Sequence, residues 1–142
     1  MRLALFVTVL ALLQASPAPA ARQAAGPPAC FGDVATVRLS QIKPGGSIQG
    51  FQKAVAAHLA WYRANGIKDN DIVAARVFVR DEKTGAPIRY SDTEMLSLHF
   101  RPPDAERTPN KNDPAWQAFV KQYRDNSDLK VEYLACIPKV SR

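Results

Sequence analysis

Two kinds of hydrophobic pattern divide the chain between residues 34 and 135. In four stretches apolar residues alternate with polar ones, which is typical of a strand with one buried face. In two others they recur every three or four residues, which indicates an amphipathic helix. In chain order the pattern predicts a strand at 34–42, a helix at 48–65, strands at 72–80 and 95–100, a helix at 114–125 and a strand at 129–135.

Residues suited to helix ends and turns support this division. Ser47 is a suitable N-cap for the first helix, because its hydroxyl can accept a hydrogen bond from a free backbone N–H, and Gly66 can end that helix. Asp113 followed by Pro114 opens the second helix. The polar segment 81–87, which contains Gly and Pro, predicts a hairpin loop between the second and third strands.

The third strand has an alternative interpretation. Ser91 followed by Glu94 at the third position matches a helix capping box. We favour a strand, because Leu96, Leu98 and Phe100 alternate with other residues and an Arg-Pro-Pro segment follows them directly.

The order strand, helix, strand, strand, helix, strand predicts an α+β domain of the ferredoxin-like kind, βαββαβ. It would have a four-stranded antiparallel sheet and both helices on one face. We expect the helices to cover the more apolar face, formed by Val37, Leu39, Val73, Val77, Val79, Leu96, Leu98, Phe100, Val131 and Tyr133. The other face would be open and mixed in character, with Thr36, Arg38, Arg76, Phe78, Met95, Ser97, His99, Glu132 and Leu134.

The N-terminus has the pattern of a secretory signal peptide. A positive residue is followed by a short apolar run and a small-x-small end, so we predict a signal peptide at 1–20. The run is too short for a permanent membrane anchor, which is the alternative. Residues 21–32 are predicted to be a flexible leader, 33–138 the folded domain and 139–142 a C-terminal tail.

The chain has two cysteines, Cys30 and Cys136, one near each end of the predicted domain. In an exported protein a pair of cysteines predicts a disulfide rather than a metal site, and two free buried thiols are the alternative. The first and last strands are neighbours in the predicted sheet, so the two residues are expected to meet. These features predict a periplasmic or secreted location.

The formal net charge of +6 changes this picture little. The basic residues are spread along the chain with no run of Lys and Arg, so nucleic acid is not a predicted partner. No cluster of Cys and His has the spacing of metal ligands, and no nucleophile motif is present. We therefore predict no metal and no cofactor.

The predicted open face carries the candidate site residues. His99 could act as an acid or base near neutral pH, or could be a half-exposed histidine at a dimer contact. Arg38 and Arg76 could bind a carboxylate or phosphate, or could pair with acidic side chains such as Glu132. Ser97 lies beside His99 on the same face, and Ser97 and Glu132 complete the predicted ligand-binding set with the two arginines.

A second, weaker candidate lies on the first helix. His58 and Trp61 are close enough in sequence to share a small recognition patch, through which the protein could dock to a larger assembly. Simple packing of both side chains against the rest of the domain is the alternative.

The element order and patterning over roughly residues 33–137 resemble the dimeric α/β-barrel superfamily, which includes antibiotic-biosynthesis monooxygenases and NIPSNAP-type proteins. The resemblance implies a homodimer joined through the open sheet face and a small ligand bound in the barrel. We predict non-catalytic binding of a small ligand or a protein partner through the open face. The alternative is a cofactor-independent monooxygenase-like enzyme using His99.

Overall fold

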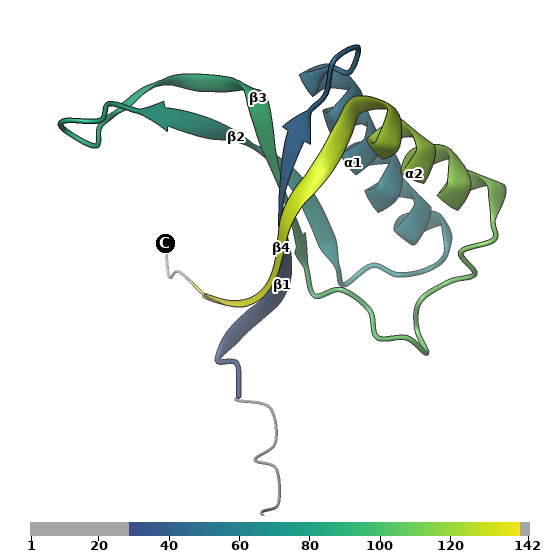
Figure 1. The fold of residues 1–142 in the computed structure, drawn as a ribbon. Coiled ribbons are helices and arrows are strands. Elements are labelled where there is room, and N and C mark those ends of the chain that lie inside the picture. Colours follow the sequence, from purple (N-terminus) through teal and green to yellow (C-terminus); the bar gives the residue numbers. More distant parts are fainter. Residues whose placement is uncertain (1–28, 140–142) are drawn as a thin grey trace, which may run out of the picture.

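The computed structural model describes residues 29–139. The predicted signal peptide, residues 21–28 of the predicted leader and residues 140–142 of the predicted tail lie outside this range. The described elements are β1 (Gly32–Ile42), α1 (Ile48–Ala64), β2 (Asp71–Arg80), β3 (Pro87–Phe100), α2 (Pro114–Asn126) and β4 (Ser127–Pro138), shown in Figure 1. This is the order that the hydrophobic pattern predicts.

The four strands form one antiparallel sheet in the order β2-β3-β1-β4. Both helices lie on the same side of it, and no helix formed by residues 29–139 lies on the other side (Figure 1). The predicted ferredoxin-like α+β fold is therefore confirmed.

Both helices begin and end where the sequence predicts. Ser47 caps α1 by accepting the N–H of Gly50 at 2.9 Å, and Gly66 follows the helix with a positive φ of 80°. Glycine adopts this left-handed conformation without steric cost, which explains why α1 ends there. Asp113 caps α2 in the same way as Ser47, by accepting the N–H of Ala115 at 2.8 Å.

The strand interpretation of residues 95–100 is confirmed, and β3 is longer than predicted because it begins at Pro87. The capping-box signal at Ser91 has a local explanation. The Ser91 hydroxyl accepts the N–H groups of Thr93 and Glu94 at 3.3 and 3.0 Å, at the point where the pairing of β3 with β2 shifts register. Ser91 thus caps a tight turn inside an irregular strand instead of a helix.

The predicted assignment of the two sheet faces is wrong. The helices cover the face that carries Met95, Ser97 and His99, whose exposed fractions are 0%, 5% and 4%. The core cluster joins residues of this face to aromatic residues of the helices: Phe51, Val55, Trp61, Tyr62, Ile72, Met95 and Phe119. The helices bring large aromatic side chains, and these fit over a face with small side chains such as Ser97 and Ala74.

The predicted disulfide is confirmed. Cys30 is bonded to Cys136, with their Cα atoms 5.6 Å apart and 106 positions apart in sequence. Cys136 pairs with Val34 in the ladder between β1 and β4, so the bond ties β4 to the segment that precedes β1. Both ends of the described chain are therefore fastened to each other.

Trp61 is buried, with 4% of its surface exposed, so it cannot form the exterior recognition patch that the sequence suggested. Its indole Nε1 donates to Oδ2 of Asp113 at 2.5 Å. Asp113 therefore caps α2 with one carboxylate oxygen and holds α1 with the other.

Replacing Asp113 by Ala is expected to lower the free energy of unfolding by about 1–2 kcal/mol, because a helix cap and a hydrogen bond to a buried indole are both lost. Denaturant unfolding of the disulfide-bonded protein measures this. Asp92→Ala is the matched control, since Asp92 makes only an exposed ion pair with Arg89 and should lose at most about 0.5 kcal/mol. Equal losses in the two variants would contradict the double role of Asp113.

Candidate functional sites

A small pocket lies between the sheet and the helix layer. Its volume is about 240 Å³, and its lining comes from both layers: Arg38, Ser40, His58, Ile72, Ser97, Tyr123, Arg124, Ser127 and Leu129. None of these side chains is acidic. The pocket exists because β1 and β3 place short polar side chains opposite the rings of α1 and α2.

Arg38 is the charged group on the sheet side of this pocket. Its neighbours across the strands are Ser97 on β3 and Glu132 on β4. The Arg38 Nε donates to Glu132 at 2.5 Å, and the Arg38 side chain is 34% exposed. Among residues 29–139, neither terminal nitrogen of its guanidinium has a hydrogen-bond partner, so both remain available to a ligand.

His58 projects from α1 into a cluster of rings. Its imidazole stacks on Phe119 with the centroids 4.3 Å apart and on Tyr62 at 5.1 Å. Burial, followed by the charges of His99 and Arg38, lowers the pKa of His58 to about 3. The side chain is therefore neutral at physiological pH, and its buried Nε2 has no hydrogen-bond partner among the described residues.

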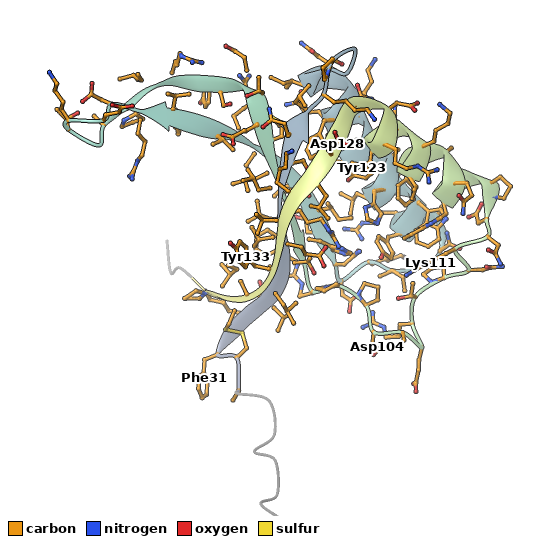
Figure 2. The ribbon with its side chains drawn as sticks, in the orientation of Figure 1. Phe31, Asp104, Lys111, Tyr123, Asp128 and Tyr133 are labelled. Carbon is orange, nitrogen blue, oxygen red and sulfur yellow. A yellow bond between two sulfur atoms is a disulfide. The ribbon has the colours of Figure 1, made fainter. Side chains whose placement is uncertain are left out.

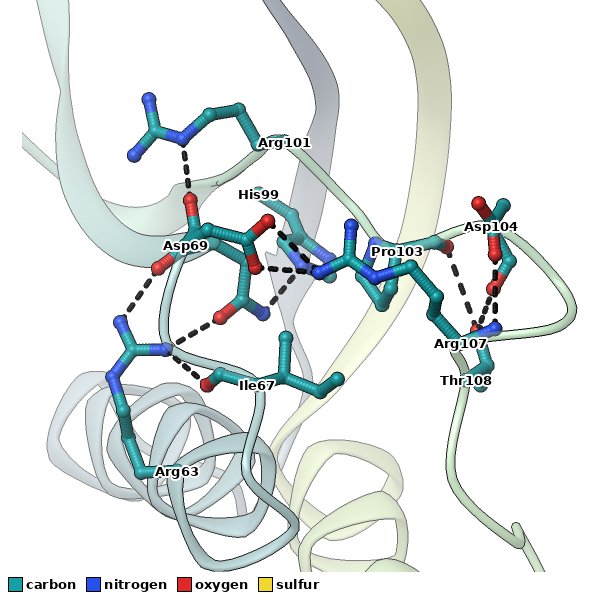
Figure 3. Close-up of polar contacts among 10 residues, drawn as sticks. Arg63, Ile67, Asp69, His99, Arg101, Pro103, Asp104, Arg107 and Thr108 are labelled. Carbon is teal, nitrogen blue, oxygen red and sulfur yellow. Dashed lines mark hydrogen bonds and ion pairs between the residues drawn. The ribbon is translucent and has the colours of Figure 1, made fainter.

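His99 lies behind His58, with the two ring centroids 5.6 Å apart. Arg63 donates to Oδ1 of Asn70 at 2.5 Å, which leaves the Asn70 amide NH₂ facing Nε2 of His99 at 3.2 Å (Figure 3). Because an NH₂ group can only donate, Nε2 of His99 must accept and so carries no proton. Burial and the charge of Arg38 lower the pKa of His99 to about 4, in agreement with a neutral ring.

The β3–α2 loop is fastened to the α1–β2 loop beside His99. Arg107 donates to both carboxylate oxygens of Asp69 at 2.7 and 2.8 Å, and this contact lowers the pKa of Asp69 (Figure 3). Arg101 also reaches this point, where it donates to the backbone oxygen of Asp69 and to the carboxylate of Asp33. These contacts hold the two loops together at the end of the domain where His99 lies.

The structure brings only part of the predicted ligand-binding set together. Arg38 and Ser97 line the pocket and Glu132 pairs with Arg38, whereas His99 is enclosed behind His58. Arg76 lies outside the pocket lining: it donates to the backbone oxygen of Ser91 at 3.1 Å, and its guanidinium lies 4.8 Å from the Tyr90 ring centroid.

Sequence reasoning missed two groups of pocket residues. Ser40 could have been found, because it shares the strand parity of Arg38, which places both on one face. Tyr123 and Arg124 could not, because their contribution depends on how α2 packs over β4.

The second candidate site is the open sheet face. It consists of three cross-strand rows on the side away from the helices, which we call the open face: Val73, Leu98, Val37 and Tyr133; Ala75, Leu96, Leu39 and Val131; and Asp71, Phe100, Ala35 and Ala135. Asp71, on the edge strand, is the one charged residue in these rows. Tyr133 is 63% exposed and Val73 40%, whereas the small side chain of Ala35 is fully buried, at 0%. Tyr133 and the pocket residue Tyr123 lie on opposite sides of the sheet (Figure 2).

The hairpin of β2 and β3 extends beyond the rest of the sheet, away from the helices (Figure 1). Pairing of β1 with β3 stops at Glu94, so residues 87–93 of β3 have only β2 as a neighbour. We call residues 78–90 the hairpin arm. Its apolar residues Phe78, Ile88 and Tyr90 are 51%, 61% and 48% exposed, and the rings of Phe78 and Tyr90 stack on each other at 4.6 Å.

A wider hollow of about 670 Å³ lies over the two helices, near Trp61 and Asp113, and five of its twelve lining residues are alanines. Lys121 and Asp125 in its lining already form an ion pair with each other. It offers no convergent polar groups, so the pocket at Arg38 is the better candidate for a small ligand.

Among residues 29–139, no three His, Cys, Asp or Glu side chains are grouped to hold a metal ion, and no helix is long and apolar enough to cross a membrane. No family model, curated protein or solved structure compared with the chain matches it.

Proposed function

We propose that the protein is an exported, non-catalytic binding domain that works as a homodimer, with two copies joined through the open face. The observation that carries this proposal is the composition of the open face, on which eleven of twelve positions are apolar and the charged one lies on the edge strand. Contiguous apolar surfaces that the rest of the chain leaves uncovered mark interaction sites in soluble proteins.

A second copy suits this surface better than a charged or polar partner. A face whose one charged residue lies at its edge offers few hydrogen-bond groups, so its partner must also be apolar. Another copy supplies a sheet of the same size and composition, and two such faces can pack at the usual sheet spacing of about 10 Å. The hairpin arm projects to the same side and could reach past the edge of the partner's sheet.

The hairpin arm gives a second reason to expect a partner. A two-stranded hairpin without further support is of marginal stability in water. The arm nevertheless keeps three large apolar side chains half exposed. Contact with another copy would bury them, and the arm and the open face would then form one continuous interface.

The histidines favour binding over acid–base catalysis. Nε2 of His99 is occupied by Asn70, so the remaining nitrogen of the neutral ring, Nδ1, carries the proton and cannot accept another. His58 is buried among aromatic rings. This arrangement gives the monooxygenase-like alternative no available base at His99.

Export is the remaining part of the proposal. The disulfide is consistent with an oxidising compartment, because thiols in the cytosol are kept reduced. The N-terminal pattern of a positive residue, an apolar run and a small-residue end supports a signal peptide.

Replacing Leu98 by Glu is expected to convert the dimer into a monomer. Leu98 lies in the middle row of the open face, on a central strand, so pairing two copies would bury two carboxylates against each other. The loss should exceed about 3 kcal/mol of association free energy, or more than about a hundredfold in dissociation constant. Sedimentation equilibrium of the mature protein measures it.

Leu134→Glu is the matched control, because Leu134 is a leucine at the sheet surface like Leu98 but lies on β4, is paired with Thr36 on the opposite face and is 74% exposed. This variant should remain a dimer. Circular dichroism checks that both variants fold. A wild-type chain that is monomeric at micromolar concentration would contradict the proposal.

A further inference from the structure

We propose that the pocket between sheet and helices binds a small monocarboxylate with a compact apolar body, and that Arg38 holds the carboxylate. The inference deepens the proposed function, since it names the ligand of a binding domain. It places the ligand on the covered side of the sheet, away from the proposed dimer interface.

The charge of the pocket selects an anion. Arg38 and Arg124 both line it, and no acidic side chain does. Glu132, beside the pocket, engages only Nε of Arg38. Arg38 and Arg124 each carry a positive charge, Glu132 carries a negative one and both histidines are neutral. The local charge is therefore +1, which one carboxylate would neutralise.

The geometry of Arg38 suits a carboxylate in particular. The planar guanidinium can present its free terminal nitrogens to two oxygens at once, which a carboxylate matches. The hydroxyl groups of Ser40 and Ser97 lie on the strands beside Arg38 and have no side-chain hydrogen-bond partner among residues 29–139. A bound carboxylate would give these donors an acceptor.

The walls of the pocket limit the rest of the ligand. Apart from the polar groups around Arg38, the lining is the ring of His58, the ring of Tyr123 and the side chains of Ile72 and Leu129. A volume of about 240 Å³ corresponds to roughly eight waters at about 30 Å³ each, and so to a molecule of about eight to ten non-hydrogen atoms. Aromatic or branched carboxylates of the size of benzoate satisfy both conditions.

Isothermal titration calorimetry of the mature, disulfide-bonded protein with sodium benzoate tests the inference. Benzamide, which has the same shape without the charge, should bind at least about tenfold more weakly, because a charge-assisted hydrogen-bond pair is worth about 1.5–3 kcal/mol. Arg38→Gln should weaken benzoate binding at least about tenfold and leave benzamide binding nearly unchanged. Ser97→Ala should weaken benzoate binding by a smaller factor.

Arg76→Gln is the matched control. It removes the same charge from the same sheet face, but Arg76 lies outside the pocket lining, so benzoate binding should be unchanged. Circular dichroism of each variant verifies the fold. Absence of benzoate binding at millimolar concentration would overturn the inference, and so would equal weakening by Arg38→Gln and Arg76→Gln.

Sedimentation of the same samples keeps this inference separate from the proposed homodimer. A dimer that does not bind benzoate overturns the ligand inference alone. A monomer that binds benzoate through Arg38 supports the ligand inference and overturns the dimer.

Discussion

Replacing Cys30 and Cys136 together by Ser is expected to lower the free energy of unfolding by about 4–5 kcal/mol. The disulfide closes a loop with a sequence separation of 106 residues, and in the chain-entropy account a loop of about 100 residues restricts the unfolded chain by nearly this amount. A small domain has only about 5–15 kcal/mol of net stability. The variant would therefore lose a large part of its stability and could be partly unfolded at 37 °C.

Guanidinium chloride unfolding of the oxidised protein and of the double Cys→Ser variant measures the difference. Adding a reductant to the wild type should bring its midpoint close to that of the variant, and adding it to the variant should change nothing. A loss below about 1 kcal/mol would show that the unfolded chain is already restricted in another way, or that the bond strains the native state.

The order of elements could be predicted because the chemistry that defines it is local. Alternation and helical spacing are readable within a few residues, and Ser47, Gly66 and Asp113 act through backbone groups two or three positions away. The disulfide was predicted from the presence of two cysteines in a chain with a signal-peptide pattern, and the predicted topology agreed with it because the fold makes β1 and β4 neighbours.

The face covered by the helices could not be predicted in this way. Strand alternation separates two sets of residues but does not say which set the helices meet. The more apolar set was expected under the helices, yet it forms the open face. The helices supply their own large side chains, Phe51, Tyr62 and Phe119, so the sheet beneath them needs small residues and not additional bulk.

Because the helices cover the other face of the sheet, the same candidate residues form a different kind of site from the one predicted. Arg38 and Ser97 were chosen for an open surface, and they lie instead in a partly enclosed pocket with His58 and Tyr123. Enclosure strengthens the interaction of a charge with a ligand, because less water screens it. It also removes His99 from contact with solvent and fixes its tautomer through Asn70.

The two faces of the sheet therefore suit different partners. The open face is apolar and extended, which suits another protein surface, while the covered face has a small charged cavity, which suits a small molecule. β1 contributes to both, because Val37 and Leu39 point one way and Arg38 and Ser40 the other.

Acidification from pH 7 to pH 5 is expected to destabilise the protein strongly, before most carboxylates titrate. Burial lowers the pKa of His58 to about 3 and that of His99 to about 4, with smaller contributions from the charge of Arg38 to both. In the unfolded chain each histidine has a pKa near 6.5. The unfolded state therefore binds protons first as the pH falls through about 6.5, and stability is complete above that value and declines below it.

Each histidine contributes a slope of up to about 1.4 kcal/mol per pH unit in this window, so the pair should cost about 4 kcal/mol between pH 7 and pH 5. The contact between Asn70 and His99 also opposes protonation of the folded protein, because a proton on Nε2 of His99 would place two hydrogen-bond donors against each other. Urea unfolding at a series of pH values and one protein concentration measures the slope.

His58→Phe separates the two contributions. Phenylalanine can keep the stacking on Phe119 and Tyr62 while removing one titrating group. The variant should therefore keep about half of the wild-type slope between pH 6.5 and pH 5, with the remainder due to His99. Tyr90→Phe, a change on the exposed hairpin arm, should leave the slope unchanged. A wild-type stability that does not vary between pH 7 and pH 5 would mean that neither imidazole is held neutral by the fold.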